Sequence, residues 1–146
     1  MTRINLVPPS ELTDQHLFAE FREIKMVPRA LARSLRTRTK HEVLSRIPPT
    51  YRLNAGHVLF FYDKGLYLEK RFESLCRELR RRGTDYNREA VVDILGVFQD
   101  HDFRKDYKPT PEAFRIIRRR IRQKIDMQPS WYRYYGLPLN DSDFFY

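Results

Sequence analysis

The sequence predicts an all-α fold in which three main helices form one compact domain spanning residues 1–146. Apolar residues recur at steps of three and four in three separate stretches, which is the spacing of a helix with one buried face. No stretch shows the convincing alternation of apolar and polar residues that a strand would have. The apolar, β-prone stretch 58–62 is short and has no partner strand. The length suits one domain, and the 41% hydrophobic content supports a core.

The first helix is expected to begin near Leu12, after an extended N-terminal segment that ends at Pro8-Pro9. Ser10 is a plausible N-cap, because its hydroxyl can accept a hydrogen bond from a free amide of the first turn. The apolar stripe consists of Leu17, Phe21, Ile24, Leu31 and Leu35. Pro28 is expected to kink or interrupt this helix, since proline removes a backbone donor and clashes with the preceding turn.

The second helix is expected between about Asp63 and Arg82, after a loop that starts with a basic run at 36–40 and closes at Pro48-Pro49. Its buried face consists of Leu68, Phe72, Leu75, Cys76 and Leu79. The arginines at 80–82 suit the negative end of the helix dipole, and Gly83 suits the position after the last turn.

The third helix is expected to begin at Thr110-Pro111, where a capping residue precedes a first-turn proline, and to end at Gln128-Pro129. Its core stripe consists of Phe114, Ile117, Ile121 and Ile125. A short helical turn is expected at 88–95 and a loop at 96–111. An aromatic segment, 131–136, follows the third helix.

The charge balance favours a polyanionic partner. Lys and Arg number 28 against 19 Asp and Glu, a formal net charge of +9, so nucleic acid is the first expectation and an anionic membrane surface the second. No apolar run approaches the roughly 18 residues of a membrane span, and the start lacks a signal-peptide apolar region. The single cysteine, Cys76, excludes a disulfide framework and fits a reduced compartment. We therefore expect a cytoplasmic protein.

Metal and cofactor chemistry are not indicated. The histidines at 16, 41, 57 and 101 show no metal-ligand spacing. The sequence also lacks a glycine-rich phosphate loop, a nucleophile-elbow serine and a paired-carboxylate signature. We expect no metal, organic cofactor or small-molecule cofactor.

The third helix carries the strongest signal for nucleic acid. Six basic residues lie within 115–124 and no acidic residue interrupts them, which suits neutralisation of phosphates. The alternative is a solvated charged face, although such a face usually mixes both signs. In the aromatic segment, Trp131, Tyr132 and Tyr134 could stack on bases while Arg133 binds phosphate, or the rings could cover the helix ends.

The N-terminus carries a possible nucleophile. Residue 2 is small, so processing is expected to remove Met1 and leave Thr2 with a free α-amine, whose ordinary pKa of about 7.7–8.0 lies far below that of lysine. Glu23, on one helix face with His16, could handle protons beside it. Each has a simpler interpretation: most termini fray, His16 could be a structural hydrogen-bonding residue, and Glu23 could pair with Arg22 or Lys25, or with Lys40.

Several collinear motifs resemble the pyrimidine-dimer DNA glycosylase family of the phage endonuclease V type. They are Thr2-Arg3-Ile4-Asn5-Leu6, Asp14-Gln15-His16-Leu17, Arg22-Glu23, Ala55-Gly56-His57-Val58, Phe60-Phe61-Tyr62-Asp63-Lys64 and Trp131-Tyr132-Arg133-Tyr134-Tyr135-Gly136. The resemblance covers nearly the whole chain, but residues 80–111 match weakly. Where phage-type sequences have a basic residue just after Glu23, this chain has Met26.

The resemblance implies a fold whose N-terminal segment is threaded between the first two helices, and a glycosylase that also nicks DNA. It implies that the Thr2 α-amine attacks C1′ of the deoxyribose to form an imine. The Glu23 equivalent assists base release and β-elimination. The DNA contacts carried over by position are Arg3, Gln15, His16, Arg22, Arg120 and Lys124.

The sequence therefore predicts a monomeric DNA glycosylase and abasic-site lyase that acts on cyclobutane pyrimidine dimers in double-stranded damaged DNA, associated with the nucleoid when bound. Two alternatives stay open. The same imine chemistry could act chiefly on other damaged bases or abasic sites, since lesion choice depends on pocket shape. A non-catalytic basic protein could bind DNA or RNA by charge alone, but it would need neither Thr2 nor Glu23.

Overall fold

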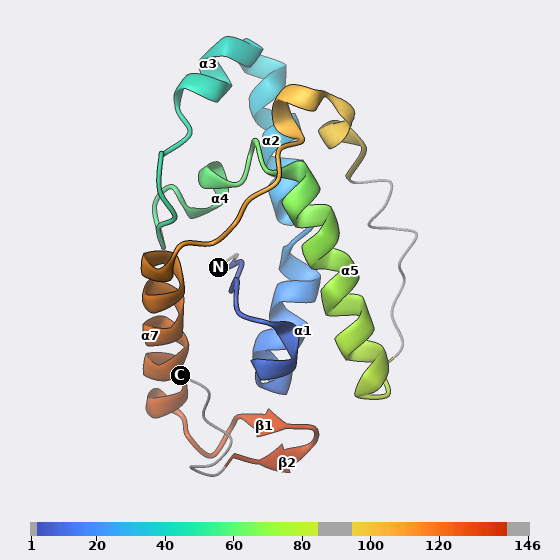
Figure 1. Cartoon of the computed structure of the whole chain (residues 1–146), viewed down its shortest axis with the longest axis vertical. Helices are drawn as coiled ribbons and strands as arrows, with labels where there is room; N and C mark the ends of the chain where they lie inside the picture. The colour runs from blue at the N-terminus through green and yellow to red at the C-terminus, as the bar shows by residue number, and fades with distance from the viewer. Residues whose placement is uncertain (1–2, 85–94, 140–146) are drawn as a thin grey trace.

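A computed structural model describes residues 3–84 and 95–139, and Figure 1 shows that its described part is mostly helical with one small sheet. The elements are η1 (Pro9–Glu11), α1 (Asp14–Glu23), α2 (Met26–Thr37), α3 (Lys40–Ser45), α4 (His57–Phe60), α5 (Gly65–Arg81), η2 (Leu95–Gln99), η3 (His101–Phe103), α7 (Pro111–Met127), β1 (Arg133–Tyr134) and β2 (Leu137–Pro138). The all-α prediction agrees with this helical content, apart from the two short strands. The turn expected at 88–95 lies outside the described residues except for Leu95.

The first expected helix is in fact two helices, α1 and α2, and they meet at Ile24 and Lys25 rather than at Pro28. Pro28 is the third residue of α2, where a backbone N–H has no partner within the helix, so proline costs little there. The predicted interruption of this helix is therefore confirmed, and it lies in the turn before Pro28, where proline clashes with the carbonyl of the residue four positions earlier, Ile24. The cap was misplaced, because Thr13 rather than Ser10 caps α1 by accepting the His16 N–H at 3.1 Å.

The other long helices match their predicted ranges. Helix α5 lies within the expected 63–82 range, and Gly83 follows it with a left-handed φ of 80°. Helix α7 begins with Thr110 as its cap and Pro111 in its first turn. Two short α-helices were missed: α3 lies in an expected loop, and α4 overlaps the β-prone stretch. The loop expected at 96–111 also contains most of η2 and all of η3.

The aromatic segment forms a small antiparallel hairpin of β1 and β2, which the sequence analysis did not predict. Tyr135 and Gly136 make its turn with φ values of 52° and 78°, as a two-residue hairpin requires. Figure 1 places this hairpin at the end of the molecule where α7 finishes and α1 begins.

The N-terminal segment, residues 4–7, is buried without regular secondary structure. Side chains supply partners for its backbone. Glu20 on α1 accepts the Asn5 N–H at 3.0 Å, and Arg71 on α5 donates to the carbonyls of Leu6 and Val7 at 3.2 and 2.6 Å. Glu20 and Arg71 form a buried ion pair at 2.6 Å. Because buried backbone groups need such partners, these bonds fix the path of the segment.

Candidate functional site

Arg3 lies at the centre of a group of charged and aromatic side chains from separate elements. Its guanidinium is half-buried, and burial together with the nearby charge of Arg120 lowers the pKa of Arg3. Tyr51, Glu23 and Tyr132 act in the opposite direction. The N-terminal segment, the end of α1, the middle of α7 and the aromatic segment therefore meet around Arg3. The structure thus brings together four of the predicted site residues.

Glu23 is the carboxylate of this group. It is the last residue of α1, and its side chain is partly buried. Within residues 3–84 and 95–139 no ion pair involves Glu23, so the predicted alternative of a pairing with Arg22 or Lys25 is not formed there. Lys40 instead pairs with Asp100 and Asp102 at 2.8 and 2.5 Å. Glu23 is thus a carboxylate that no described cation neutralises by direct contact.

His16 faces inward from α1. Its Nδ1 lies 2.6 Å from the Thr13 hydroxyl, and its ring stacks on Tyr132 with centroids 4.9 Å apart and planes 6° apart. Burial, and then the charges of Arg3 and Lys124, lower the pKa of His16 to about 4. The imidazole is therefore neutral near pH 7, and its surroundings place Lys124 in the same group as Arg3.

Gln15 fastens the aromatic segment to α1. Its side-chain Nε2 donates to the Trp131 carbonyl at 2.8 Å, and its Oε1 accepts the Arg133 N–H at 2.9 Å. Both ends of the Gln15 amide are therefore occupied by backbone. A contact from this side chain to DNA would compete with these two bonds.

The predicted aromatic residues face different ways. Tyr132 is only 6% exposed and packs on His16, whereas Trp131 is 56% exposed. The Tyr134 hydroxyl donates to the Ser10 carbonyl at 2.7 Å, and Arg133 donates to the Ser130 carbonyl at 3.2 Å. Trp131 therefore has the open ring face that base stacking would need, and Tyr132 covers the core.

A second clamp on the hairpin was missed by sequence reasoning. The Asp14 carboxylate accepts the N–H groups of Tyr135 and Gly136 at 3.1 and 2.8 Å and pairs with Arg82 at 2.8 Å. Arg82 also pairs with Glu78 at 2.9 Å and lies over the Tyr135 ring at 4.6 Å. These residues lie far apart in the sequence, so no local pattern indicates the contact.

Two grooves border the clamped segment. One, of about 410 Å³, is lined by Asp14, Gln15, Phe18, Ala19, Arg22 and Trp131. The other, of about 320 Å³, includes Leu17, Leu79 and Arg81 among its lining residues. Arg22 is exposed, and among the described residues it forms no ion pair. Arg22, which was predicted to contact DNA, therefore lines the same groove as the exposed ring of Trp131.

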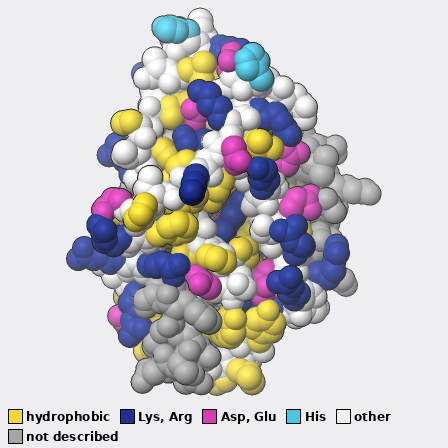
Figure 2. All heavy atoms as spheres, viewed as in Figure 1, with side chains coloured by type: hydrophobic (Ala, Val, Ile, Leu, Met, Phe, Trp, Pro, Cys, Tyr) yellow, Lys and Arg dark blue, Asp and Glu magenta, His cyan; other side chains and the backbone are white. Residues whose placement is uncertain are grey.

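Some of the basic side chains on α7 form ion pairs, and others have no ion-pair partner among the described residues. Arg118 pairs with Glu11 at 3.3 Å, Arg122 pairs with Asp126 at 3.2 Å, and Arg115 contacts Glu112. Arg120 and Lys124, one turn apart, have no ion-pair partner in the described part of the chain. Figure 2 shows Lys and Arg side chains spread over one face of the molecule, around a central area of exposed hydrophobic side chains.

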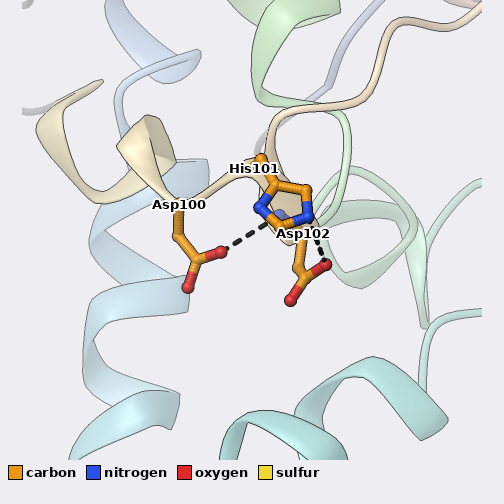
Figure 3. A group of neighbouring side chains, drawn as sticks. All are labelled: Asp100, His101 and Asp102. Atoms are coloured by element: carbon orange, nitrogen blue, oxygen red, sulfur yellow. Dashed lines mark hydrogen bonds and ion pairs between the residues drawn. The ribbon is translucent and has the colours of Figure 1, made fainter.

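One group of three potential metal ligands exists among the described residues, at Asp100, His101 and Asp102 (Figure 3). His101 Nε2 lies 3.3 Å from an Asp102 oxygen, and the Asp102 N–H donates to Asp100 at 3.0 Å. The Lys40 ammonium contacts both carboxylates and already offsets part of their charge. All three lie on the surface at η3, and we assign no metal to them.

A partly buried carboxylate among cations suits an enzyme that acts on nucleic acid, because the cations can bind phosphates and the carboxylate can accept a proton. No helix in residues 3–84 and 95–139 has the length and apolar character needed to cross a bilayer. The family model for pyrimidine dimer DNA glycosylase matches residues 1–93, more than half of the chain. The chain belongs to the pyrimidine dimer DNA glycosylase family, and DNA is its substrate.

The family match includes the N-terminal segment, Glu23 and the stretch around His57. Residues beyond 93, among them Arg120, Lys124 and the aromatic segment, lie outside it and join the site through the fold. Thr2, the predicted nucleophile, lies outside the described residues.

Proposed function

We propose that this glycosylase is also an abasic-site lyase and that it works through an imine. The nitrogen lone pair of the Thr2 α-amine attacks C1′ of a deoxyribose in a dimer-containing duplex, and the C1′–N bond to the base breaks with its electron pair leaving on the base. Opening of the sugar ring gives the imine. Removal of a C2′ proton then expels the 3′ phosphate and nicks the strand.

The observation that carries this proposal is the surroundings of Glu23. Base release develops positive charge on the sugar, which a carboxylate without a bound cation stabilises, and the same carboxylate can later accept the C2′ proton. Glu23 is such a carboxylate, and it lies near Arg3. Arg3 directly follows Thr2 in the sequence. Two residues of extended chain span at most about 7 Å, which limits how far Thr2 can lie from the buried Ile4.

The surrounding cations support the nucleophile as well as the substrate. Arg3, Arg120 and Lys124 form one group of positive charges, and positive neighbours disfavour the protonated form of an amine. A neutral amine is the form that attacks carbon. The same cations suit the phosphates that flank a lesion. A protein that binds DNA by charge alone would have no use for the carboxylate among them.

The rest of the proposal concerns partners. The substrate is double-stranded damaged DNA, the chain acts as a monomer, and it works in the cytoplasm, on the nucleoid when bound. The imine chemistry needs no metal or organic cofactor, because the amine and one carboxylate supply all of its proton transfers.

Borohydride reduction tests the mechanism. Protein is incubated with one of three matched duplexes, which contain a cyclobutane dimer, an abasic site or no damage, and sodium borohydride is added. We expect a covalent protein–DNA adduct with the first two duplexes and none with the third. Acetylation of the terminus should abolish the adduct, and normal trapping after acetylation would instead assign the nucleophile to an internal lysine such as Lys25.

Mass spectrometry of the same active preparation provides the second check. We expect Met1 to be absent, because retention of Met1 would leave the Thr2 nitrogen in a peptide bond. Active protein that retains Met1 in full would contradict the proposed nucleophile. An adduct with the abasic duplex but none with the dimer would indicate that the imine chemistry acts on another lesion.

A further inference from the structure

The N-terminal segment is fixed at Ile4 by two side chains that have no role in the proposed chemistry. The Ile4 N–H donates to His57 Nε2 at 2.8 Å, and the Tyr51 hydroxyl donates to the Ile4 carbonyl at 2.9 Å. Ile4, Tyr51 and His57 are all buried. Both backbone groups of one residue are thus bonded by side chains about 50 positions away in the sequence.

Two partners fix the protonation state of His57. Its Nδ1 lies 2.8 Å from the Arg52 carbonyl, which can only accept, so Nδ1 carries the proton. Its Nε2 must then be unprotonated to accept the Ile4 N–H. A second proton would set two donors against each other at 2.8 Å. The observed path of the segment therefore requires a neutral imidazole.

The environment of His57 favours that neutral form. The ring packs edge-on against Tyr51 and Phe61, with centroids 5.4 and 5.5 Å away. Two charged groups influence the pKa of His57: Arg3 from the N-terminal segment and Glu20 from α1. Burial is the largest effect, and with Arg3 it lowers the pKa of His57 in spite of the Arg52 carbonyl and Glu20, which act to raise it.

The backbone before His57 is shaped to present the ring. Gly56 has a φ of 85°, a conformation that glycine adopts without strain, and His57 directly follows it as the first residue of α4. A Cβ at Gly56 would lie 3.1 Å from the Arg52 side chain. This turn brings the Arg52 carbonyl back onto His57 Nδ1.

We propose that His57 is a positioning residue for the reactive terminus, because its unprotonated Nε2 holds Ile4 and thereby sets where Arg3 and Thr2 can reach relative to Glu23. This inference rests on the proposed function, since it assigns His57 to the placement of the Thr2 amine. A displacement of about 1 Å at a reacting atom can cost on the order of a hundredfold in rate. Loss of the His57 bond is therefore expected to slow chemistry more than it weakens DNA binding.

Three variants test the role of His57 in the reaction. His57→Gln keeps an acceptor for Ile4 but does not titrate, and His57→Phe keeps a packed ring but has no acceptor. His41→Gln is the control, because His41 is exposed on α3. The measurements are the single-turnover rate of borohydride trapping with an abasic-site duplex, the affinity for that duplex, and the thermal midpoint.

We expect His57→Phe to trap about ten- to a hundredfold more slowly at unchanged affinity. His57→Gln and His41→Gln should stay within about threefold of the natural protein, consistent with a hydrogen-bonding rather than a titrating role near pH 7. The trapping rate of His57→Gln should also fall less between pH 7 and pH 5 than that of the natural protein. A folded His57→Phe variant that traps at the natural rate would overturn the proposal.

Nuclear magnetic resonance of the natural protein without DNA gives an independent answer, which holds even if His57→Phe does not fold. Nitrogen-15 shifts should show a protonated Nδ1 and an unprotonated Nε2 on His57 at pH 7, and the Ile4 amide signal should move as His57 titrates. A protonated Nε2 would overturn the positioning role. Failure of the natural protein to form any imine would instead reject the proposed function.

Discussion

At the scale of single residues, Glu23 is the side chain on which the proposed chemistry depends. Glu23→Gln keeps the size and polarity of the side chain but removes the charge and the ability to accept a proton. We expect base release to fall by about 10²–10⁴-fold, the usual contribution of a general acid–base group, while affinity for a dimer-containing duplex changes by less than about threefold. Single-turnover base release and gel-shift titration measure the two quantities.

Glu112→Gln is the matched control for the Glu23 substitution. Glu112 is an exposed carboxylate in the first turn of α7, where it contacts Arg115. This variant should release base at the natural rate. Equal losses in Glu23→Gln and Glu112→Gln, or unchanged turnover in the first, would remove Glu23 from the mechanism.

Arg120 and Lys124 are the α7 cations whose charges act on Arg3 and His16, respectively. Arg120→Ala and Lys124→Ala should each weaken binding to duplex DNA and reduce the slope of log affinity against log salt by about one, because each contact releases condensed counterions. Lys70→Ala is the control, since Lys70 pairs on the surface with Asp106 at 2.7 Å. A slope equal to that of the natural protein would mean that Arg120 or Lys124 faces away from DNA.

Sequence reasoning predicted candidate site residues from the quoted motifs and from their positions along the third helix. Arg3, Glu23 and Arg120 were predicted separately, and the structure places their charges within reach of one another. It did not find a role for Tyr51 or His57, because hydrogen bonds across about 50 residues leave no local periodicity. His57 does lie in a quoted motif, but the motif alone does not indicate its bond to Ile4.

At the scale of elements, prediction succeeded where helices are long and capped. Helices α5 and α7 each have 17 residues, enough turns to display a stripe, and α7 also has a clear start signal. Helix α3 has six residues and helix α4 four, which is too short for periodicity to indicate a helix. The break between α1 and α2 was predicted only approximately, because a proline indicates that a helix is interrupted but does not indicate at which residue of the preceding turn.

The contact between α5 and η2 gives a stability prediction. A Cβ added at Gly65 would lie 2.5 Å from the Phe98 Cβ, and the Phe98 ring is buried, so Gly65→Ala should lower the free energy of unfolding by about 1–3 kcal/mol. Gly96→Ala is the control, because no heavy atom lies within 4 Å of its added Cβ. Denaturant unfolding compares the two, and equal stability would contradict the tight packing of α5 on η2.

The hairpin was missed for a related reason. Strands of two residues cannot show alternation, and β1 and β2 depend on Asp14 and Arg82 for their placement. Both clamps bind the hairpin to the start of α1, one through Gln15 and the other through Asp14. The orientation of the aromatic segment is thus a property of the tertiary structure.

At the scale of the whole molecule, buried neutral histidines couple stability to pH. His16 has a folded pKa of about 4 against about 6.5 when unfolded, so the unfolded chain binds more protons between these values. Its contribution is therefore fully present above pH 6.5 and is lost as pH falls towards 4. The loss from His16 is roughly 3 kcal/mol, and His57 acts in the same direction. Thermal unfolding at a series of pH values from 7.5 to 4 measures this loss of stability.

His16→Phe separates this effect from general acid denaturation. The variant keeps a ring for Tyr132 to stack on but does not titrate, so its unfolding free energy should fall less steeply below pH 6.5. His41→Gln should retain the natural pH profile, since His41 is exposed. A steep profile in His16→Phe equal to the natural one would mean that His16 does not sense pH in the folded protein.

The buried N-terminal segment also has a consequence for biosynthesis. Residues 4–7 leave the ribosome before their partners, which extend to Arg71, so the segment cannot settle until nearly half of the 146 residues have been made. The proposed removal of Met1 would therefore have its opportunity early, while this segment is still accessible to an aminopeptidase. A nascent or broken chain that lacks α5 would not hold this end in place, so the nitrogen of the proposed nucleophile would be aligned only once α5 has been made.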